Sequence, residues 1–306
     1  MIASADASKY AAVKGGAARI VFVTGKGGTG KSFLARALAR AASARAMAVA
    51  LVHARPPALA GIASGGHASS NGRSLPFRQI ELDEREALES FLTRILRLGF
   101  VARRLLDSRT FSAVAAAAPG VSDLVRLLGI TALSRPEHGL DLIVVDAPAT
   151  GHSLPLLTAP RRILELAPMG PVAREARIAQ AIVENPARFV PVIMTTPEEL
   201  AVTETLALHE DIARAGVAAA RVVVNGMWPA HLQAPEADWL LSSAASADAA
   251  LHWKRHRRQV ELIDMLEARV GACPRLPFAF HEGETSPAAV AAVLDLLVPD
   301  GGARRP

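Results

Sequence analysis

One eight-residue stretch constrains the fold of this chain more than any other part of the sequence. Residues 25–32 read Gly-Lys-Gly-Gly-Thr-Gly-Lys-Ser and fit the pattern G-x-x-x-x-G-K-S/T of a phosphate-binding P-loop. An apolar run at residues 19–23 predicts a buried strand before the loop, and an Ala-, Leu- and Arg-rich run at residues 33–46 predicts a helix after it. A functional P-loop requires a strand before it and a helix after it. Because both are predicted here, a plain glycine-rich turn is the weaker alternative for residues 25–32.

The loop predicts a site for a nucleotide and Mg²⁺. Its glycines allow backbone N–H groups to surround phosphate oxygens, and the start of the helix adds the positive end of its dipole. Lys31 would reach the β- and γ-phosphates, and the Ser32 hydroxyl would hold Mg²⁺. A second lysine, Lys26, is poorly placed for its own γ-phosphate but could reach a nucleotide held by a facing subunit. A solvated loop lysine is the alternative for Lys26.

Composition sets the remaining limits. The 306 residues allow one large α/β domain or two smaller ones, and 51% hydrophobic residues supply a core. The net charge of +5 is dispersed, so we expect no nucleic-acid partner. The single cysteine, Cys273, excludes an internal disulfide framework and a multi-thiol metal site within one chain. Without a signal-peptide pattern or an apolar run of about 20 residues, we expect a cytoplasmic protein with no transmembrane segment.

Strands and helices alternate along the chain. Further apolar runs predict strands at residues 46–52, 77–82, 140–145, 189–195, 221–224 and 273–278. Helical patterns occur at residues 161–184 (with breaks at Pro168 and Pro171), 197–215, 230–270 and 286–297. The alternation predicts a doubly wound α/β fold whose mostly parallel sheet is covered on both faces. We expect one domain at residues 19–298, between flexible ends at 1–18 and 299–306.

A helical insert at about residues 83–135 interrupts this alternation. Asp83 and Glu86 have the spacing of a capping box. Pro119 and Gly120 break the helical pattern, which resumes at residues 121–133. The insert carries an apolar stripe on one helical face: Leu88, Phe91, Leu92, Ile95 and Leu96. Such a stripe forms core more often than a ligand groove.

A carboxylate follows the short apolar strand at residues 140–145. Asp146 stands where a Walker B element places the residue that faces Mg²⁺, with a helix or turn cap as the alternative. Residues 150–152 predict a flexible turn that would respond to the γ-phosphate. Ligands of a parallel sheet lie at the carboxyl ends of its strands, where Gly25, Asp146 and Asn225 all fall.

These residues together resemble the ATPases with a "deviant" P-loop, the class that includes ArsA, MinD and ParA. Residues 146–154 read Asp-Ala-Pro-Ala-Thr-Gly-His-Ser-Leu and resemble the switch II signature D-T-A-P-T-G-H-T-L of the ArsA-type family. That family comprises the arsenite-pump ATPases and the tail-anchored-protein targeting ATPases. Residues 118–120, 196–200, 204–205, 222–225 and 276–278 also resemble segments of this family, so the resemblance covers about residues 19–298.

The resemblance implies a set of site residues. The residues that would contact the phosphates, the rest of the nucleotide and Mg²⁺ are Gly25, Gly27, Gly28, Thr29, Gly30, Lys31, Ser32 and Phe33. Asn225 would contact the adenine, and Pro277 and Phe278 would line its pocket. Asp146 would couple to the Mg²⁺ shell through water, whereas Ser32 would bind the ion. Lys26 would act across a nucleotide-sandwich homodimer. With Lys26, Lys31 and Asp146 as catalytic residues, ATP would close the dimer and hydrolysis to ADP would open it, driving a protein partner or membrane-protein cargo.

Arg55 departs from the family pattern. The family's switch I usually reads S-T-D-P-A-H after a strand, and its Asp orients the attacking water. The matching segment, residues 53–57, reads His-Ala-Arg-Pro-Pro, so Arg55 stands where that carboxylate belongs. An arginine cannot accept a proton at neutral pH. We therefore expect hydrolysis that is slow or that depends on a partner.

Two further departures concern metals and cargo. Cys273 alone cannot supply the soft ligands that bind metalloid, so metalloid transport is disfavoured. The C-x-x-C pair that holds zinc at the dimer interface of eukaryotic targeting ATPases is also missing. The helical insert contains no methionine between residues 83 and 133, so binding of tail anchors is not specifically supported, although leucine and phenylalanine could line a groove.

Three hypotheses follow. The leading one is an ArsA-type ATP-binding homodimer that couples nucleotide state to a protein partner. The second is a nearly inactive nucleotide-binding regulatory subunit that pairs with a related ATPase as a heterodimer, and Arg55 favours it. The third, a ParA/MinD-like positioning ATPase on DNA or membrane, has the least support because no terminal amphipathic helix is present and the basic residues are dispersed. The basic run at residues 254–258 predicts a solvated helix face, with an acidic partner as the alternative.

Overall fold

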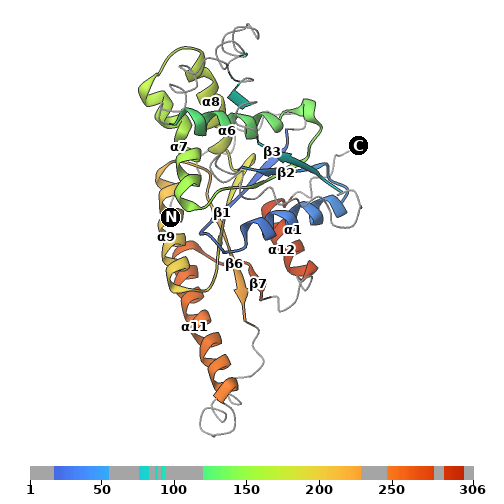
Figure 1. Ribbon diagram of the computed structural model, residues 1–306, viewed down its shortest axis with the longest axis vertical. Helices are drawn as coiled ribbons and strands as arrows, with labels where there is room; N and C mark the ends of the chain where they lie inside the picture. Colours follow the sequence, from blue (N-terminus) through green and yellow to red (C-terminus); the bar gives the residue numbers. More distant parts are fainter. Residues whose placement is uncertain are drawn as a thin grey trace.

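A single sheet organises the part of the chain that the computed structural model describes, namely residues 17–54, 76–82, 87, 88, 91, 93, 120–228, 247–278 and 286–299. Within these residues seven strands lie in the order β3-β2-β4-β1-β5-β6-β7 (Figure 1). Every neighbouring pair is parallel. The predicted doubly wound α/β fold with a mostly parallel sheet is therefore confirmed.

The elements follow the predicted alternation. The strands are β1 Arg19–Gly25, β2 Val49–His53, β3 Arg78–Glu81, β4 Leu142–Asp146, β5 Phe189–Thr195, β6 Arg221–Met227 and β7 Arg275–Pro277. The helices are α1 Lys31–Ala44, α6 Val121–Leu133, α7 Thr150–Leu166, α8 Pro171–Val183, α9 Glu199–Arg214, α11 Ala247–Val270 and α12 Pro287–Leu297. A short 3₁₀ helix, η2 Pro136–His138, precedes β4.

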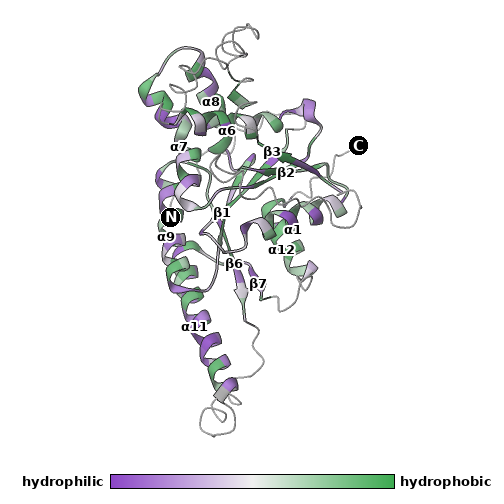
Figure 2. Cartoon of the chain, in the orientation of Figure 1, coloured by the Kyte–Doolittle hydropathy of each residue, from purple (hydrophilic) through white to green (hydrophobic). Residues whose placement is uncertain are grey.

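The sheet carries an apolar core on each face. Along β1, Ile20 and Phe22 pack with side chains from α6, α7, α8, α9 and α11, whereas Val21 and Val23 pack with side chains from α1 and α12. Figure 1 shows the same division, with α1 and α12 on one side of the sheet and α7, α9 and α11 on the other. Because both faces are buried, the central strands are apolar along most of their length, which explains why sequence pattern alone located them (Figure 2).

The structure corrects the prediction for residues 150–152. They form the first turn of α7 instead of a flexible turn, so the predicted helix start at residue 161 is also wrong. Backbone amides at the start of α7 donate to the carbonyl oxygen of Ala149 at 2.9 and 3.2 Å. Pro155 and Pro160 obscure this helix in the sequence, because proline normally interrupts helical hydrogen bonding. Burial of side chains such as Leu156 against the sheet outweighs that cost.

Other boundaries differ by a few residues. β6 continues to Met227, so Asn225 lies inside this strand and not at its end. β2 begins at Val49, later than predicted, because Ala46 has a φ of 61° in the turn that follows α1. The predicted break in the helical pattern at Pro168 and Pro171 is confirmed, since α7 ends before the first proline and α8 begins at the second.

The helical insert is described only in part. Its second half is confirmed as α6, and Phe91 of the predicted apolar stripe is buried in the core with Leu88 packed against it. The capping-box pair and the remaining stripe residues lie outside the described residues. The described part of the stripe therefore belongs to the core, as its pattern predicts.

Phe22 provides a test of the core. Its side chain is fully buried, and its ring lies 5.7 Å from that of Phe189 between centroids. We expect Phe22→Ala to lower the free energy of unfolding by about 3–5 kcal/mol, because the substitution leaves a cavity beside a second aromatic ring. Urea denaturation followed by circular dichroism measures this loss. A loss below about 1 kcal/mol would contradict the described packing.

Candidate nucleotide-binding site

The loop between β1 and α1 has a backbone that only glycine can adopt at two points. A Cβ atom on Gly25 would lie 2.2 Å from the carbonyl oxygen of Met194 on β5, and one on Gly30 would lie 2.4 Å from Nδ2 of Asn225 on β6. Both glycines have positive φ values, 138° and 95°. By contrast, Gly27 is exposed and a Cβ there would meet nothing within 4 Å. The loop is thus wedged against two strands and open on its outer side.

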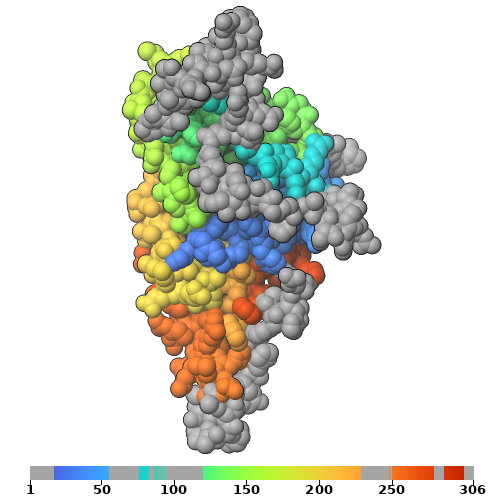
Figure 3. All heavy atoms as spheres, in the orientation of Figure 1, coloured from blue at the N-terminus to red at the C-terminus, as the bar shows by residue number. Residues whose placement is uncertain are grey.

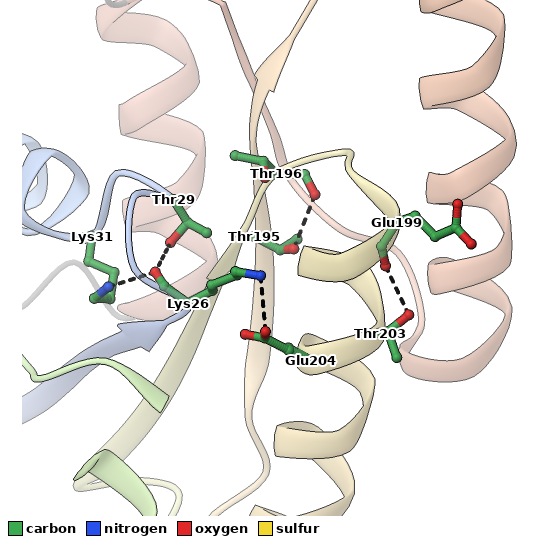
Figure 4. Close-up of polar contacts among 8 residues, drawn as sticks. All are labelled: Lys26, Thr29, Lys31, Thr195, Thr196, Glu199, Thr203 and Glu204. Atoms are coloured by element: carbon green, nitrogen blue, oxygen red, sulfur yellow. Dashed lines mark hydrogen bonds and ion pairs between the residues drawn. The ribbon is translucent and has the colours of Figure 1, made fainter. Parts of the chain in front are cut away.

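The carbonyl oxygen of Lys26 accepts hydrogen bonds from two side chains of the loop. Lys31 Nζ donates to it at 2.7 Å and Thr29 Oγ1 donates at 2.9 Å (Figure 4). Thr29 is buried and Ser32 is half-buried on the first turn of α1. The ammonium group of Lys31 is therefore held over the loop, where a phosphate oxygen could replace the carbonyl oxygen as its acceptor.

Lys26 points away from Lys31 and toward α9 (Figure 4). Its Nζ atom forms an ion pair with Glu204 Oε1 at 3.0 Å. The side chains of Lys26 and Glu204 are 29% and 38% exposed, so solvent screens the pair and its contribution to stability is at most about 1 kcal/mol. Lys26 thus has a partner in its own chain that another negative group could displace at low cost.

Asp146 lies beside the loop at the carboxyl end of β4. Only 5% of the residue is exposed, and it pairs in register with Val23 of β1 and His53 of β2. His53 Nδ1 lies 3.3 Å from Asp146 Oδ2. Burial lowers the pKa of Lys31 below its ordinary value, and the negative charge of Asp146 opposes part of that shift. Lys31 and Asp146, which were both predicted as catalytic residues, are therefore close enough to interact electrostatically.

The donor set next to the loop fits Mg²⁺. Ser32 offers a hydroxyl oxygen and Asp146 a carboxylate, and Mg²⁺ prefers oxygen ligands and keeps several waters. His53 was not among the predicted site residues. The signal that could have identified it is its place at the end of β2, which lies directly beside β4 in the sheet.

A cavity of about 320 Å³ opens beside the loop. Gly28 and Phe33 line it from the loop and α1, and Asn225, Pro277 and Phe278 line it from β6 and β7. These five residues were all predicted to contact the nucleotide, so the structure brings the predicted phosphate and base contacts to one place. Figure 3 shows the loop and α1 in blue at the surface, bordered by the yellow segment of α9.

Asn225 connects the cavity to the loop. Its Nδ2 group donates to the carbonyl oxygen of Thr29 at 3.0 Å. One of its two Nδ2 hydrogens is therefore used by the loop, while the second hydrogen and the Oδ1 acceptor remain for a ligand. Asn225 would therefore contact a base in the cavity and also support the loop that binds the phosphates.

Sequence reasoning missed other residues of the cavity wall, among them Trp228, Arg255 and Gln259. Trp228 follows β6 directly, and the other two lie on α11. The basic run at residues 254–258 is consequently more than a solvated face, since Arg255 lies over the ring of Trp228. Helical periodicity places residues on a face of α11 but does not say against which strand that face packs.

Arg55 of the predicted switch I lies outside the described residues. Cys273 is described and is buried, with its Sγ donating to the carbonyl oxygen of Gly271 at 3.3 Å. Burial, with a smaller contribution from Glu267, raises the pKa of the Cys273 thiol to about 11 despite the opposing charge of Arg275. A thiol that stays protonated at neutral pH does not suit metalloid binding, which requires thiolates.

Comparisons with known proteins agree with this geometry. The family model of the anion-transporting (ArsA) ATPases matches residues 18–167, which include the loop and Asp146. ATPase BagA of Mycobacterium tuberculosis is 30% identical over 235 residues, which cover 70% of this chain and 67% of that protein. The protein named "Putative ATPase Mb3704" of Mycobacterium bovis is similar to the same extent.

The chain is a P-loop ATPase and belongs to the anion-transporting ATPase family. The family match ends at residue 167, so the base side of the cavity, from residue 225 onward, lies beyond it. Among the helices within the described residues, none has the length and apolar character needed to cross a membrane.

Gly30 and Gly27 form a matched pair for testing the loop. We expect Gly30→Ala to lower the free energy of unfolding by about 1–3 kcal/mol, because a Cβ there meets Asn225 and the left-handed backbone becomes strained. Gly27→Ala should change it by less than about 0.5 kcal/mol, because its Cβ enters open space. Thermal and urea unfolding of both variants measure the difference. Equal effects of the two substitutions would contradict the described loop.

Proposed function

We propose that this ATPase works as a nucleotide-driven dimeric switch. ATP with Mg²⁺ closes two chains around their nucleotides, and hydrolysis to ADP opens them. The change in the dimer controls binding of a protein partner or a membrane-protein cargo. The observation that carries this proposal is the contrast between the two lysines of one loop, Lys26 and Lys31, whose side chains extend in different directions.

Lys31 serves the nucleotide of its own chain in this proposal. Its ammonium group lies over the loop, close enough to Asp146 to sense its charge. Ser32 and Asp146 hold Mg²⁺, the latter through water. When bound, Mg²⁺ neutralises charge on the β- and γ-phosphates.

Lys26 serves the nucleotide of the facing chain. Its side chain leaves the loop on the side of α9 and is held there by Glu204, not by groups that surround its own phosphate site. The side chains of this ion pair are 29% and 38% exposed and the pair is weak, so a γ-phosphate presented by a second chain can compete for the lysine. A cation supplied in trans stabilises the charge of phosphoryl transfer in the same way as an arginine finger.

Hydrolysis by this chain is proposed to be slow. Arg55 replaces the switch I carboxylate that orients the attacking water in the family, and a guanidinium group cannot act as an acceptor for that water. The second candidate function follows from the same residue: a regulatory subunit that binds nucleotide and pairs with a more active relative. Single-turnover hydrolysis by the isolated chain separates the two, because only the first predicts conversion of bound ATP without another protein.

Two lysine variants separate nucleotide binding from dimer-dependent turnover. Lys31→Ala should weaken ATP binding at least tenfold, about 1.4 kcal/mol, because it removes the cation nearest the phosphates. Lys26→Ala should bind ADP within about twofold of the unaltered protein but lower turnover by about 10³-fold, as expected for a cation that acts in trans. Equilibrium titration with a fluorescent ADP analogue and single-turnover hydrolysis measure the two effects.

Light scattering provides the accompanying control on assembly. The unaltered chain should dimerise with ATP and Mg²⁺ and dissociate with ADP, and Lys26→Ala should remain monomeric with either nucleotide. Turnover per chain that does not change with protein concentration, together with normal turnover by Lys26→Ala, would exclude the switch proposed here.

A further inference from the structure

One tryptophan links α11 to the nucleotide cavity. His252, Arg255, His256 and Gln259 occupy one face of α11, at the spacing i, i+3, i+4 and i+7, and all four contact Trp228. The Arg255 guanidinium carbon lies 4.3 Å from the centroid of the Trp228 ring, and the His252 ring meets it edge-on at 5.1 Å. These contacts fix both the ring and the helix at the cavity wall.

The backbone of Trp228 is held by the same helix. Its N–H donates to Gln259 Oε1 at 3.0 Å, and its carbonyl oxygen lies 3.0 Å from His256 Nδ1. Gln259 is 6% exposed, so this hydrogen bond is largely shielded from water. Trp228 therefore has little freedom to leave the wall when a ligand enters.

The same tryptophan also stacks on Phe278, which follows β7 and lines the same cavity. The rings of Trp228 and Phe278 lie 5.3 Å apart with an interplanar angle of 26°. Backbone hydrogen bonding supports the stack, because the Phe278 N–H donates to the Met227 carbonyl oxygen at 2.7 Å. The cavity thus offers flat aromatic surface, and Phe278 remains 39% exposed.

We propose that Arg255 of α11 is a further binding residue that holds the base of a purine nucleotide in this cavity, an inference that rests on the proposed nucleotide-dependent function. The guanidinium plane already lies over an aromatic ring in the cavity wall, and a purine presents a similar flat surface. Arg255 is exposed and its contact with Trp228 is not buried, so the side chain can move onto an incoming base.

The polar groups of the cavity favour adenine over guanine. Asn225 gives one of its two Nδ2 hydrogens to Thr29, and it keeps the Oδ1 acceptor and the second Nδ2 hydrogen for a base. Adenine carries an amine donor beside a ring-nitrogen acceptor, which complements one acceptor and one donor. Guanine carries two acceptors at the same edge and would place an oxygen against Asn225 Oδ1.

The test compares a nucleotide with a ligand that lacks a base. Dissociation constants of ATP, GTP and inorganic tripolyphosphate are measured on the full chain by competition with a fluorescent ADP analogue. Arg255→Ala should weaken ATP binding about tenfold, because base stacking is lost, and leave tripolyphosphate binding within about twofold. Arg255→Lys should resemble Arg255→Ala, because it keeps the charge but loses the planar group.

Arg257→Ala is the matched control. Arg257 is exposed on the same helix and belongs to the same basic run, so its loss changes the net charge equally. This variant should bind ATP within about twofold of the unaltered protein. In steady-state assays Arg255→Ala should raise KM for ATP with little change in kcat, as expected when uniform binding is removed.

The outcomes distinguish this inference from the proposed function. Normal ATP binding by Arg255→Ala, or equal weakening of ATP and tripolyphosphate, would overturn the role of Arg255 while leaving the ATPase proposal intact. Failure of the unaltered chain to bind any of the three ligands would overturn both. Binding of GTP as tight as that of ATP by the unaltered chain would contradict the preference for adenine assigned to Asn225.

Discussion

The close packing of the P-loop against β5 and β6 is the constraint on which the rest of the site depends. Gly25 sits against the backbone of β5, and Gly30 sits against the side chain of Asn225 on β6. Asn225 in turn donates to the loop through the carbonyl oxygen of Thr29. Because these contacts tie the loop directly to the sheet, the phosphate side and the base side of the cavity have one fixed geometry.

In this geometry the two lysines of the loop have different surroundings. Lys31 remains over the loop near Asp146, whereas Lys26, separated from it by the glycines, reaches the surface of α9. The base side is built from β6, β7 and α11, and Trp228 is the shared contact of four α11 side chains on that side: His252, Arg255, His256 and Gln259. A helix that lies far along the chain from the loop can in this way contribute to nucleotide selectivity.

Sequence pattern predicted the loop, the buried strands and Asp146, because each depends on local residue types at fixed spacing. It failed at residues 150–152, where Pro155 obscures a helix that tertiary packing stabilises. It could not place Arg255 in the cavity, since that depends on how α11 packs against Trp228. The partner of Lys26 was missed for the same reason, because Glu204 comes from a helix distant in sequence.

The most direct test of the account is complementation between two inactive variants. Lys26→Ala keeps its nucleotide site, and Lys31→Ala keeps the lysine that is proposed to act in trans. Only a mixed dimer has a complete site, one instead of two, so turnover of an equal mixture should rise well above that of either variant alone and to at most about half of the unaltered protein's value. Turnover that stays at the level of the separate variants would contradict the action of Lys26 across a dimer.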